Sequence, residues 1–542
     1  MTGYTAHVDT FARDHLPPAE QWPQFSGLDE LGYPPRLNCA VELLDRAVAE
    51  GDGARTVVTS PALTWSYAEL QAHADRVAHV LTRDLGMVAG ERVLLRGPNN
   101  PWMVACWFGV VKAGGIAVAT MPLLRAPELR KIIAKARVRL ALCDARLLDE
   151  LELARPAVPE LERVVSFNGG ELEGLMNHHP AGFQAAYTAA DDPCMIAFTS
   201  GTTGQPKGTV HFHRDVLAVC DTFSREVLRP TRDDLFIGSP PLAFTFGLGG
   251  LTLFPMRARA ATALVEQVAP PDLLAALQRF RPTVLFTSPI AYRALADMVS
   301  ADDVASLRLC VSAGETLPQP TSDAWFERTG LRIIDGIGST ELLHIFIAAA
   351  GDAIRPGSTG VAVPGYQARV VDADGTPLPA GEVGLLEVRG PTGCRYLDDP
   401  RQADYVVDGW NRTGDAYLQD ADGYFWFQAR ADDMIVAAGY NIAGPEVEAA
   451  LLAHDAVAEC AVVGAPDPQR GTVVKAFVVL REGAGPGDAA LLKALQDHVK
   501  ATIAPYKYPR AVEFVTTLPR TETGKVQRFK LRQAGQQRAG PG

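Results

Sequence analysis

The stretch 198-FTSGTTGQPKG-208 decides how the rest of this sequence is interpreted. It overlaps the apolar run 194-CMIAF-198, which is typical of a buried strand. A strand that ends in glycines and hydroxyl side chains exposes successive backbone N–H groups, and these can surround a phosphate chain without obstruction from side chains. A lysine adds a positive charge. We therefore predict a phosphate-binding loop made by the following residues: Thr199, Ser200, Gly201, Thr202, Thr203, Gly204 and Lys207.

The residues of this loop suggest two other interpretations. A flexible surface loop is the simplest, but the lysine and the preceding buried strand favour a phosphate site. A Walker P-loop requires GxxxxGK followed by Ser or Thr, so that the hydroxyl can hold Mg²⁺. Pro206 occupies the second glycine position and Gly208 follows Lys207, so the Walker motif fails at two positions. The loop is a different phosphate-binding device.

The bulk composition excludes several classes of protein. At 542 residues the chain is too long for one hydrophobic core, so several packed units are expected. Its net charge of −12 argues against a nucleic-acid partner, because neutralising phosphates requires a basic face. The sequence has no run of about 18 apolar residues and no signal-like N-terminus, so we expect no membrane span and a cytoplasmic location.

The eight cysteines show neither a CxxC spacing nor a matching histidine cluster. Such scattered cysteines are typical of small buried hydrophobic residues in a reducing compartment. We therefore expect no zinc site.

Short apolar runs alternate with helical periodicity on the N-terminal side of the loop. Residues 67–81 place apolar side chains on one helical face, 92–97 resemble a strand, 101–115 a helix that stops at glycine, and 116–120 another strand. This alternation predicts βαβ units, and hence a parallel sheet covered by helices on both faces. Ligands bind such sheets at the carboxyl ends of the strands.

The pattern of predicted strands, helices and turns changes on the C-terminal side of the loop. Alternation returns near residues 283–289 and 307–315, and after about residue 355 the D-G and P-A-G turns predict hairpins of a smaller β-rich unit. From about residue 433 a compact α/β unit follows, with helices predicted at 445–455 and 488–503.

Further motifs follow in a fixed order: GIGSTE at 336–341, RTGD at 412–415, RADDMIVAAGYNIAGPEVE at 430–448 and LPRTETGK at 518–525. With the loop at 198–208, they resemble the motifs of the acyl-adenylate-forming superfamily along nearly the whole chain. That superfamily includes acyl- and aryl-CoA synthetases, peptide-synthetase adenylation domains and firefly-type luciferases. Ile337 stands where the family commonly has an aromatic residue.

The resemblance implies an α/β fold of two domains. Residues 1–431 would form a large N-terminal domain of parallel-rich sheets sandwiched by helices, with a β-barrel-like subdomain at about 355–430. Residues 432–542 would form a small mobile α+β lid. In the family this lid rotates about a hinge, which the motif RADD places at Asp432, and it then presents Gly439 and Tyr440 to the pantetheine arm of CoA.

The resemblance also implies the roles of individual residues. Lys525 would bridge the substrate carboxylate and the α-phosphate of ATP and stabilise the charge that gathers there. Thr340 would touch phosphate, and Glu341, with Thr202, would hold Mg²⁺. The ribose ligands would be Asp415 and Arg430, with a loop salt bridge as the alternative. The other nucleotide contacts would come from Ala313, Gly314, Glu315, Asp335, Gly336 and Ile337.

The acid pocket is expected at residues 240–250 and after Glu341. Flat apolar walls with a glycine-rich turn favour a short aromatic acid, because bulky rings close the tunnel that an alkyl chain needs. The stretches 242–250 and 338–346 resemble those of benzoate and 2-aminobenzoate CoA ligases. The residues expected to contact the substrate are Phe244, Thr245, Phe246, Gly247, Gly338, His344 and Ile345.

His344 bears on the identity of the acid. A neutral imidazole could accept a hydrogen bond from an ortho amino or hydroxyl group, which benzoate lacks. This favours 2-aminobenzoate over benzoate or a hydroxybenzoate, while a core histidine without a substrate role stays the alternative.

The acceptor is predicted to be CoA. Only 17 residues follow Lys525, so no carrier domain is expected on this chain. A separate carrier protein, an adenylating oxygenase and a nucleotide-binding regulator without catalysis are the alternatives. Arg470 or Lys507 could contact the CoA phosphates, and a homodimer is one candidate for the assembly.

Overall fold

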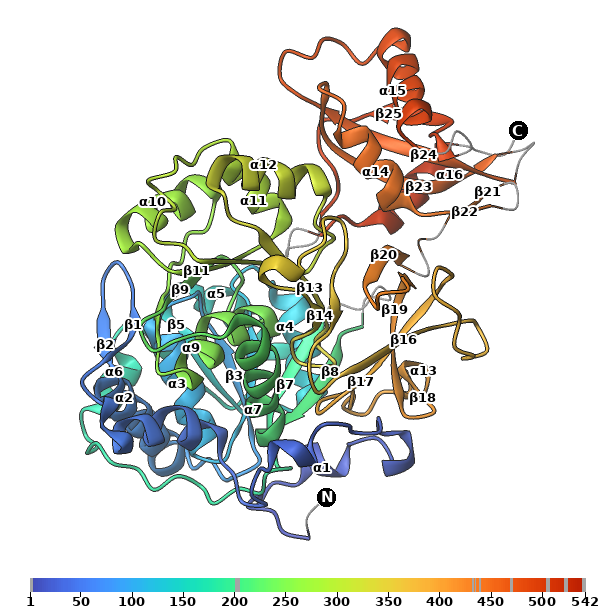
Figure 1. Cartoon of the computed structure of the whole chain (residues 1–542). Helices are drawn as coiled ribbons and strands as arrows, with labels where there is room; N and C mark the ends of the chain where they lie inside the picture. The colour runs from blue at the N-terminus through green and yellow to red at the C-terminus, as the bar shows by residue number, and fades with distance from the viewer. Residues whose placement is uncertain are drawn as a thin grey trace.

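The computed structural model describes residues 3–199, 205–430, 433, 435–437, 440–467, 471–503, 507–520 and 525–538. Figure 1 shows a large body, coloured blue to yellow, with a smaller orange-red unit at the upper right. The β-rich strands, coloured orange, lie at the lower right beneath that unit.

A six-stranded sheet carries the phosphate-loop stretch, and its strand order is β6-β5-β3-β4-β7-β8. Five of these strands run parallel, and β8 returns antiparallel to β7. The strands are β3 (Arg92–Arg96), β4 (Ile116–Thr120), β5 (Leu140–Asp144), β6 (Arg163–Phe167), β7 (Pro193–Thr199) and β8 (Lys207–Phe212). The βαβ alternation predicted from the sequence is confirmed here.

A nine-stranded sheet forms the other half of the large body, with parallel strands in its centre and antiparallel strands at both edges. In spatial order the strands are β15 (Val361–Ala362), β14 (Ile345–Ala348), β13 (Ile333–Gly338), β12 (Leu309–Ala313), β11 (Val284–Thr287), β9 (Leu235–Gly238), β10 (Ala261–Ala263), β1 (Thr56–Thr59) and β2 (Thr64–Ser66).

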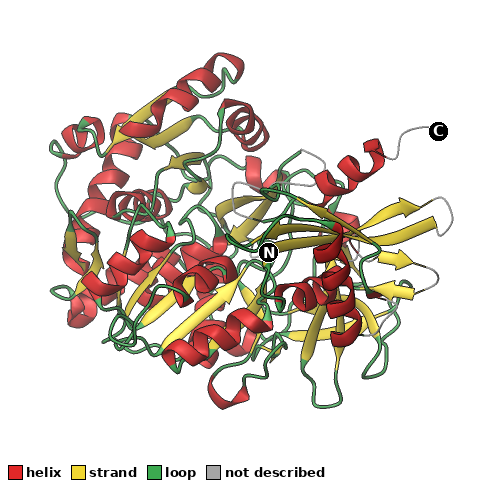
Figure 2. Ribbon diagram, turned by 90° about the horizontal axis from the view of Figure 1, so that it is seen from above, coloured by secondary structure: helices red, strands yellow, loops and turns green. Residues whose placement is uncertain are grey.

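Helices lie on both sides of these sheets (Figure 2). They are α1 (Phe11–Asp14), α2 (Tyr67–His79), α3 (Pro101–Lys112), α4 (Ala126–Ala136), α5 (Leu148–Ala154), α6 (Glu171–Met176), α7 (His213–Val219), α8 (Thr245–Leu248), α9 (Phe254–Arg257), α10 (Pro270–Phe280), α11 (Pro289–Ala296), α12 (Gln319–Thr329) and α13 (Gln402–Tyr405). Among the described helices, none is both long and apolar enough to cross a bilayer.

Local chemistry explains why the helices begin where they do. Ser66 and Glu69 form a reciprocal capping box at the start of α2. Asn100 caps α3, whose first residue is proline. The two helices pack closely, because a Cβ at Gly109 would lie 2.5 Å from Val77.

The β-rich subdomain is a five-stranded antiparallel sheet of β16 (Gln367–Val371), β17 (Val383–Arg389), β18 (Val406–Val407), β19 (Trp410–Gln419) and β20 (Phe425–Arg430). The small C-terminal unit has a hairpin, β21 (Ile435–Ala437) and β22 (Tyr440–Ile442), and a sheet of β23 (Val457–Asp467), β24 (Gly471–Leu480) and β25 (Ala511–Phe514). Its helices are α14 (Gly444–Leu452), α15 (Ala489–Thr502) and α16 (Arg528–Arg538), and α14 contacts α12 and β20.

The predicted fold class is confirmed by this architecture. Helix-covered, largely parallel sheets, an antiparallel subdomain and a small α+β unit all occur in the expected order along the chain. The boundary predicted at residues 431 and 432 lies outside the described residues and stays a prediction.

Candidate active site

The phosphate-loop stretch is the tip of the β7–β8 hairpin. Thr199 pairs with Lys207 in the antiparallel register, so the first and last predicted ligands stand side by side at its base. The residues between them that lie outside the described part of the chain are Ser200, Gly201, Thr202, Thr203 and Gly204.

A buried tyrosine links this hairpin to the predicted metal ligand. The hydroxyl of Tyr396 donates to Glu341 Oε1 over 2.6 Å, and Lys207 Nζ donates to the same hydroxyl over 3.3 Å. Burial and the Glu341 carboxylate raise the pKa of Tyr396, so the hydroxyl keeps its proton and can donate. Tyr396 lies in no motif of the sequence and comes from a loop 55 residues beyond Glu341.

The turn that carries Thr340 and Glu341 is held from two directions. His211 of β8 donates from Nε2 to the Thr340 carbonyl over 2.8 Å. The Ser339 hydroxyl accepts the Leu342 amide, and Leu343 adopts a left-handed φ of 71°. A non-glycine residue rarely adopts this conformation, so the surrounding contacts must hold the turn.

Asp415 and Arg430 are brought together by the pairing of β19 with β20. Arg430 Nη1 lies 2.9 Å from Asp415 Oδ1 and also donates to the Thr413 carbonyl. Burial raises the pKa of Asp415, and Arg430 partly opposes that rise. Their ion pair fits both the predicted ribose-ligand role and the salt-bridge alternative.

Lys525 reaches this region from the small C-terminal unit. It lies close enough to Asp415 and to Glu315 for its charge to lower the pKa of both carboxyls. Burial is the larger effect at Glu315 and raises its pKa, and Arg520 and Arg528 also oppose that rise. The charge of the predicted catalytic lysine therefore acts on two of the predicted nucleotide residues.

The predicted nucleotide residues on β12 and β13 meet where these neighbouring strands of the nine-stranded sheet end. Ala313 pairs with Gly336, and Gly314 then turns with a φ of 92°. Asp335 has its Oδ1 atom buried without a hydrogen-bond partner among the described residues, and burial raises its pKa to about 7. Ile337 continues β13 and pairs with β14.

The predicted acid pocket includes His344. Four phenyl rings surround its imidazole at centroid distances of 4.5 to 6.5 Å, and neither ring nitrogen bonds another side chain among the described residues. Burial lowers the pKa of His344 to about 3, an interaction with the Phe246 backbone partly opposes that shift, and the ring is neutral. The four rings are Phe223, Phe246, Phe254 and Phe286.

Glycines create the space for this imidazole. A Cβ at Gly249 would lie 2.3 Å from His344 Cδ2, and one at Gly250 would lie 2.4 Å from a ring carbon of Phe286. A Cβ at Gly338 would lie 2.7 Å from the His344 backbone. Of these, only Gly338 was among the expected contacts, although the glycines of FGLGG were a visible signal.

The remaining predicted pocket residues differ in position. Gly247 lies so near the Pro241 carbonyl that a Cβ would come within 2.1 Å of it, and Thr245 is buried at the start of α8. Phe244 precedes that helix and is not among the rings around His344. Ile345, the first residue of β14, packs against Gly336. Successive residues along a strand point to opposite faces of the sheet, so its side chain lies on a different side from that of the residue before it.

Asn99 anchors the loop before α8, and the sequence analysis missed it. Its side chain accepts the Leu242 amide over 2.8 Å and donates to the Pro240 carbonyl over 2.9 Å. These two hydrogen bonds from one side-chain amide hold residues 240–242, at the start of the stretch predicted to line the acid pocket.

The structure describes only some of the residues predicted to contact CoA or to form the hinge. Tyr440 begins β22, whereas Asp432, Gly439 and Arg470 lie outside the described residues. The Nζ of Lys507 contacts both oxygens of Glu446 at 2.6 Å.

Comparisons with known proteins bear on the whole chain. Residues 44–395 match the AMP-binding enzyme family, and residues 446–525 match the AMP-binding enzyme C-terminal domain. The benzoate–CoA ligase of Thauera aromatica is 37% identical over 510 residues, which are 92% of this chain and 97% of the relative. The 4-hydroxybenzoate–CoA/benzoate–CoA ligase of Rhodopseudomonas palustris is 33% identical over 507 residues, 92% of this chain and 94% of the relative.

Solved structures agree with these matches. The anthranilate CoA ligase AuaEII, in complex with anthranoyl-AMP, superposes with a TM-score of 0.90 at 37% identity, covering 94% of this chain and 99% of that chain. A benzoate CoA ligase from Burkholderia xenovorans LB400 superposes with a TM-score of 0.84 at 31% identity, covering 91% of this chain and 99% of that chain.

Proposed function

The chain belongs to the AMP-binding enzyme family and is an ATP-dependent, AMP-forming aryl-CoA ligase, and we propose that the acid it activates is 2-aminobenzoate. Relatives named for benzoate and hydroxybenzoate keep these acids as the alternatives. A cytoplasmic location and a homodimer stay predictions from the sequence.

The observation that carries this proposal is the buried, neutral imidazole of His344, which bonds no other side chain among the described residues. A buried polar group without a hydrogen bond costs about 1–3 kcal/mol, so a ligand that supplies the missing bond gains affinity. The neutral ring offers one lone pair and one N–H within a cage of phenyl rings. An ortho amino group would satisfy the lone pair, whereas the bare ring of benzoate would leave it unpaired.

The first half-reaction is an attack of the acid's carboxylate oxygen on the α-phosphorus of ATP. The bond from that phosphorus to the β-phosphate bridging oxygen breaks, pyrophosphate leaves, and an acyl-adenylate forms. We assign to Lys525 the role of bridging the carboxylate and the α-phosphate, where negative charge gathers, and its electrostatic influence on Asp415 and Glu315 supports this. We assign the ribose hydroxyls to Asp415 and Arg430, which form an ion pair.

Glu341 fits Mg²⁺ because its carboxylate is buried beside the base of the phosphate hairpin and has one oxygen fixed by Tyr396. The ion would neutralise charge on the departing pyrophosphate. The role of this chain is to hold the carboxylate in place, through Tyr396 and through the turn that His211 braces.

The second half-reaction is an attack of the CoA thiol on the acyl carbon, with AMP as the leaving group. With Lys525 in its assigned role the lysine would block the approach to that carbon, so we propose that the C-terminal unit moves about a hinge at Asp432 and that Gly439 contacts the thiol arm.

The test is turnover on a panel of acids, measured as pyrophosphate release and as CoA-thioester formation. We expect kcat/KM for 2-aminobenzoate to exceed that for benzoate about tenfold, which corresponds to about 1.4 kcal/mol. Decanoate serves as the control for an aryl pocket and should not be turned over. Equal or better use of benzoate would contradict the assignment of the acid, and pyrophosphate release without thioester would contradict CoA as acceptor.

A further inference from the structure

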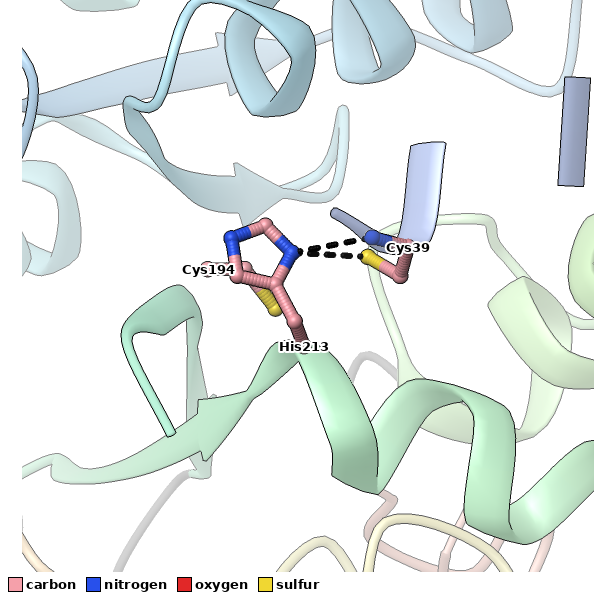
Figure 3. Close-up of side chains that lie close together, drawn as sticks. All are labelled: Cys39, Cys194 and His213. Atoms are coloured by element: carbon pink, nitrogen blue, oxygen red, sulfur yellow. Dashed lines mark hydrogen bonds between the residues drawn. The ribbon is translucent and has the colours of Figure 1, made fainter. Parts of the chain in front are cut away.

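Three side chains that the proposed reaction does not use meet in the interior beside β7 (Figure 3). They are Cys39, Cys194 and His213, and their ligand atoms all lie within 4.8 Å of one another. All three residues are fully buried. These residues are far apart in the sequence, which predicts no zinc site.

The fold explains why they meet. Cys194 lies near the start of β7, and His213 opens α7 directly after β8, the antiparallel partner of β7. Cys39 comes from the N-terminal segment, 174 residues before the histidine. The Cys39 amide donates to His213 Nδ1 over 3.1 Å, and the Cys39 Sγ lies 3.2 Å from the same nitrogen (Figure 3).

We propose that Cys39, Cys194 and His213 form a structural site for one zinc-class divalent cation. Two thiolates and an imidazole are the donor set that zinc prefers, with bonds of about 2.3 Å to sulfur and about 2.0 Å to nitrogen. Ligand atoms around such an ion lie about 3–4 Å apart. Here Cys39 Sγ lies 3.2 Å from His213 Nδ1 and all three ligand atoms lie within 4.8 Å of one another, so a small inward shift of the side chains would complete the geometry. Two thiolates also cancel the charge of the dication, so the completed centre suits a dry interior.

Ligation through Nδ1 of His213 would replace the hydrogen bond from the Cys39 amide. A bound ion would tie the N-terminal segment to the strand that leads into the phosphate loop.

The test uses the full chain, produced in zinc-supplemented medium and, separately, refolded with Co²⁺. Elemental analysis is expected to find about one zinc per chain, and the cobalt form is expected to show a thiolate-to-cobalt charge-transfer band. Cys39→Ser and Cys194→Ser should each lower the zinc content at least fivefold and abolish the band. Cys106→Ser, a buried cysteine away from the cluster, should leave both unchanged.

Two results would overturn the proposal: wild-type protein with less than about a tenth of an equivalent of zinc and no charge-transfer band, or full zinc content in both cysteine variants. Should the variants not fold, the wild-type measurements still decide. Pyrophosphate release serves as a separate readout, so failure of the metal site and failure of the proposed ligase substrate are distinguishable.

Discussion

The nucleotide side and the acid pocket of this protein treat their polar groups in opposite ways. Around the phosphate hairpin, polar side chains bind one another: Lys207 contacts Tyr396, Tyr396 contacts Glu341, and Arg430 contacts Asp415. In the predicted acid pocket, the imidazole of His344 lies among phenyl rings and bonds no other side chain within the part of the chain that the structure describes. On the nucleotide side, hydrogen bonds within the protein fix the side chains before ATP binds. In the predicted acid pocket, the imidazole can form a hydrogen bond with the acid that we propose as the substrate.

The largest expected effect tests the nucleotide side. Lys525→Ala should slow adenylate formation about 100- to 1000-fold, because a charge that stabilises the transition state is lost. Thioester formation from supplied acyl-adenylate should be nearly unchanged. Pyrophosphate release and thioester formation measure the two half-reactions, with Lys530→Ala, an exposed lysine on α16, as the control. Equal loss of both half-reactions would contradict the role given to Lys525.

The next effect tests the pocket. Gly249→Ala would place a methyl group 2.3 Å from His344 Cδ2, and overpacking of this kind costs about 1–3 kcal/mol. We expect the KM for the aromatic acid to rise about tenfold or more, with the KM for ATP unchanged. Gly174→Ala, where the new methyl group meets nothing within 4 Å, is the matched control. An equal rise in the KM for the acid and the KM for ATP would contradict the view that Gly249 shapes the acid pocket alone.

Tyr396→Phe probes the hydrogen-bonded side more gently. It removes the hydroxyl that fixes Glu341, and a hydrogen bond to a charged group contributes about 1.5–3 kcal/mol. The Mg²⁺ concentration needed for half-maximal rate should rise about tenfold, while the KM for the acid stays constant. Tyr424→Phe, whose hydroxyl donates to the Ala353 carbonyl at the surface, is the control. An unchanged Mg²⁺ dependence would separate Tyr396 from the metal ligand.

The smallest effects are two pH dependences of opposite sign. Burial raises the pKa of Asp335 from 3.8 to about 7, so the folded state holds a proton that the unfolded state has lost, and stability falls as pH rises through this window. Burial lowers the pKa of His344 from 6.5 to about 3, so the unfolded state binds the extra proton, and stability falls as pH drops through that window.

Thermal unfolding of the ligand-free protein checks both dependences. The Tm of Asp335→Asn relative to wild type should increase between pH 3.8 and about 7, and that of His344→Phe should decrease between about pH 3 and 6.5. Parallel trends in the two variants would show that at least one of these carboxyl or imidazole groups is not desolvated as described.

Much of this molecule followed from local patterns. The alternation of strands and helices, the caps of α2 and α3, and the run of motifs from the phosphate loop to Lys525 all depend on residues near one another in the chain. Local patterns predict elements because backbone hydrogen bonding and side-chain periodicity act over a few residues. The family resemblance of these motifs then implies that Glu341, Asp415 and Lys525 belong to one site.

The sequence by itself therefore determined the fold class, the family motifs and an aromatic pocket. Only the tertiary structure decided that Tyr396 holds Glu341, that Phe223, Phe254 and Phe286 enclose His344, and that Cys39 meets Cys194 and His213. These contacts join residues far apart in the chain. No periodicity encodes them, because such contacts are set by how whole sheets and helices pack, and packing depends on the shape of every side chain between them.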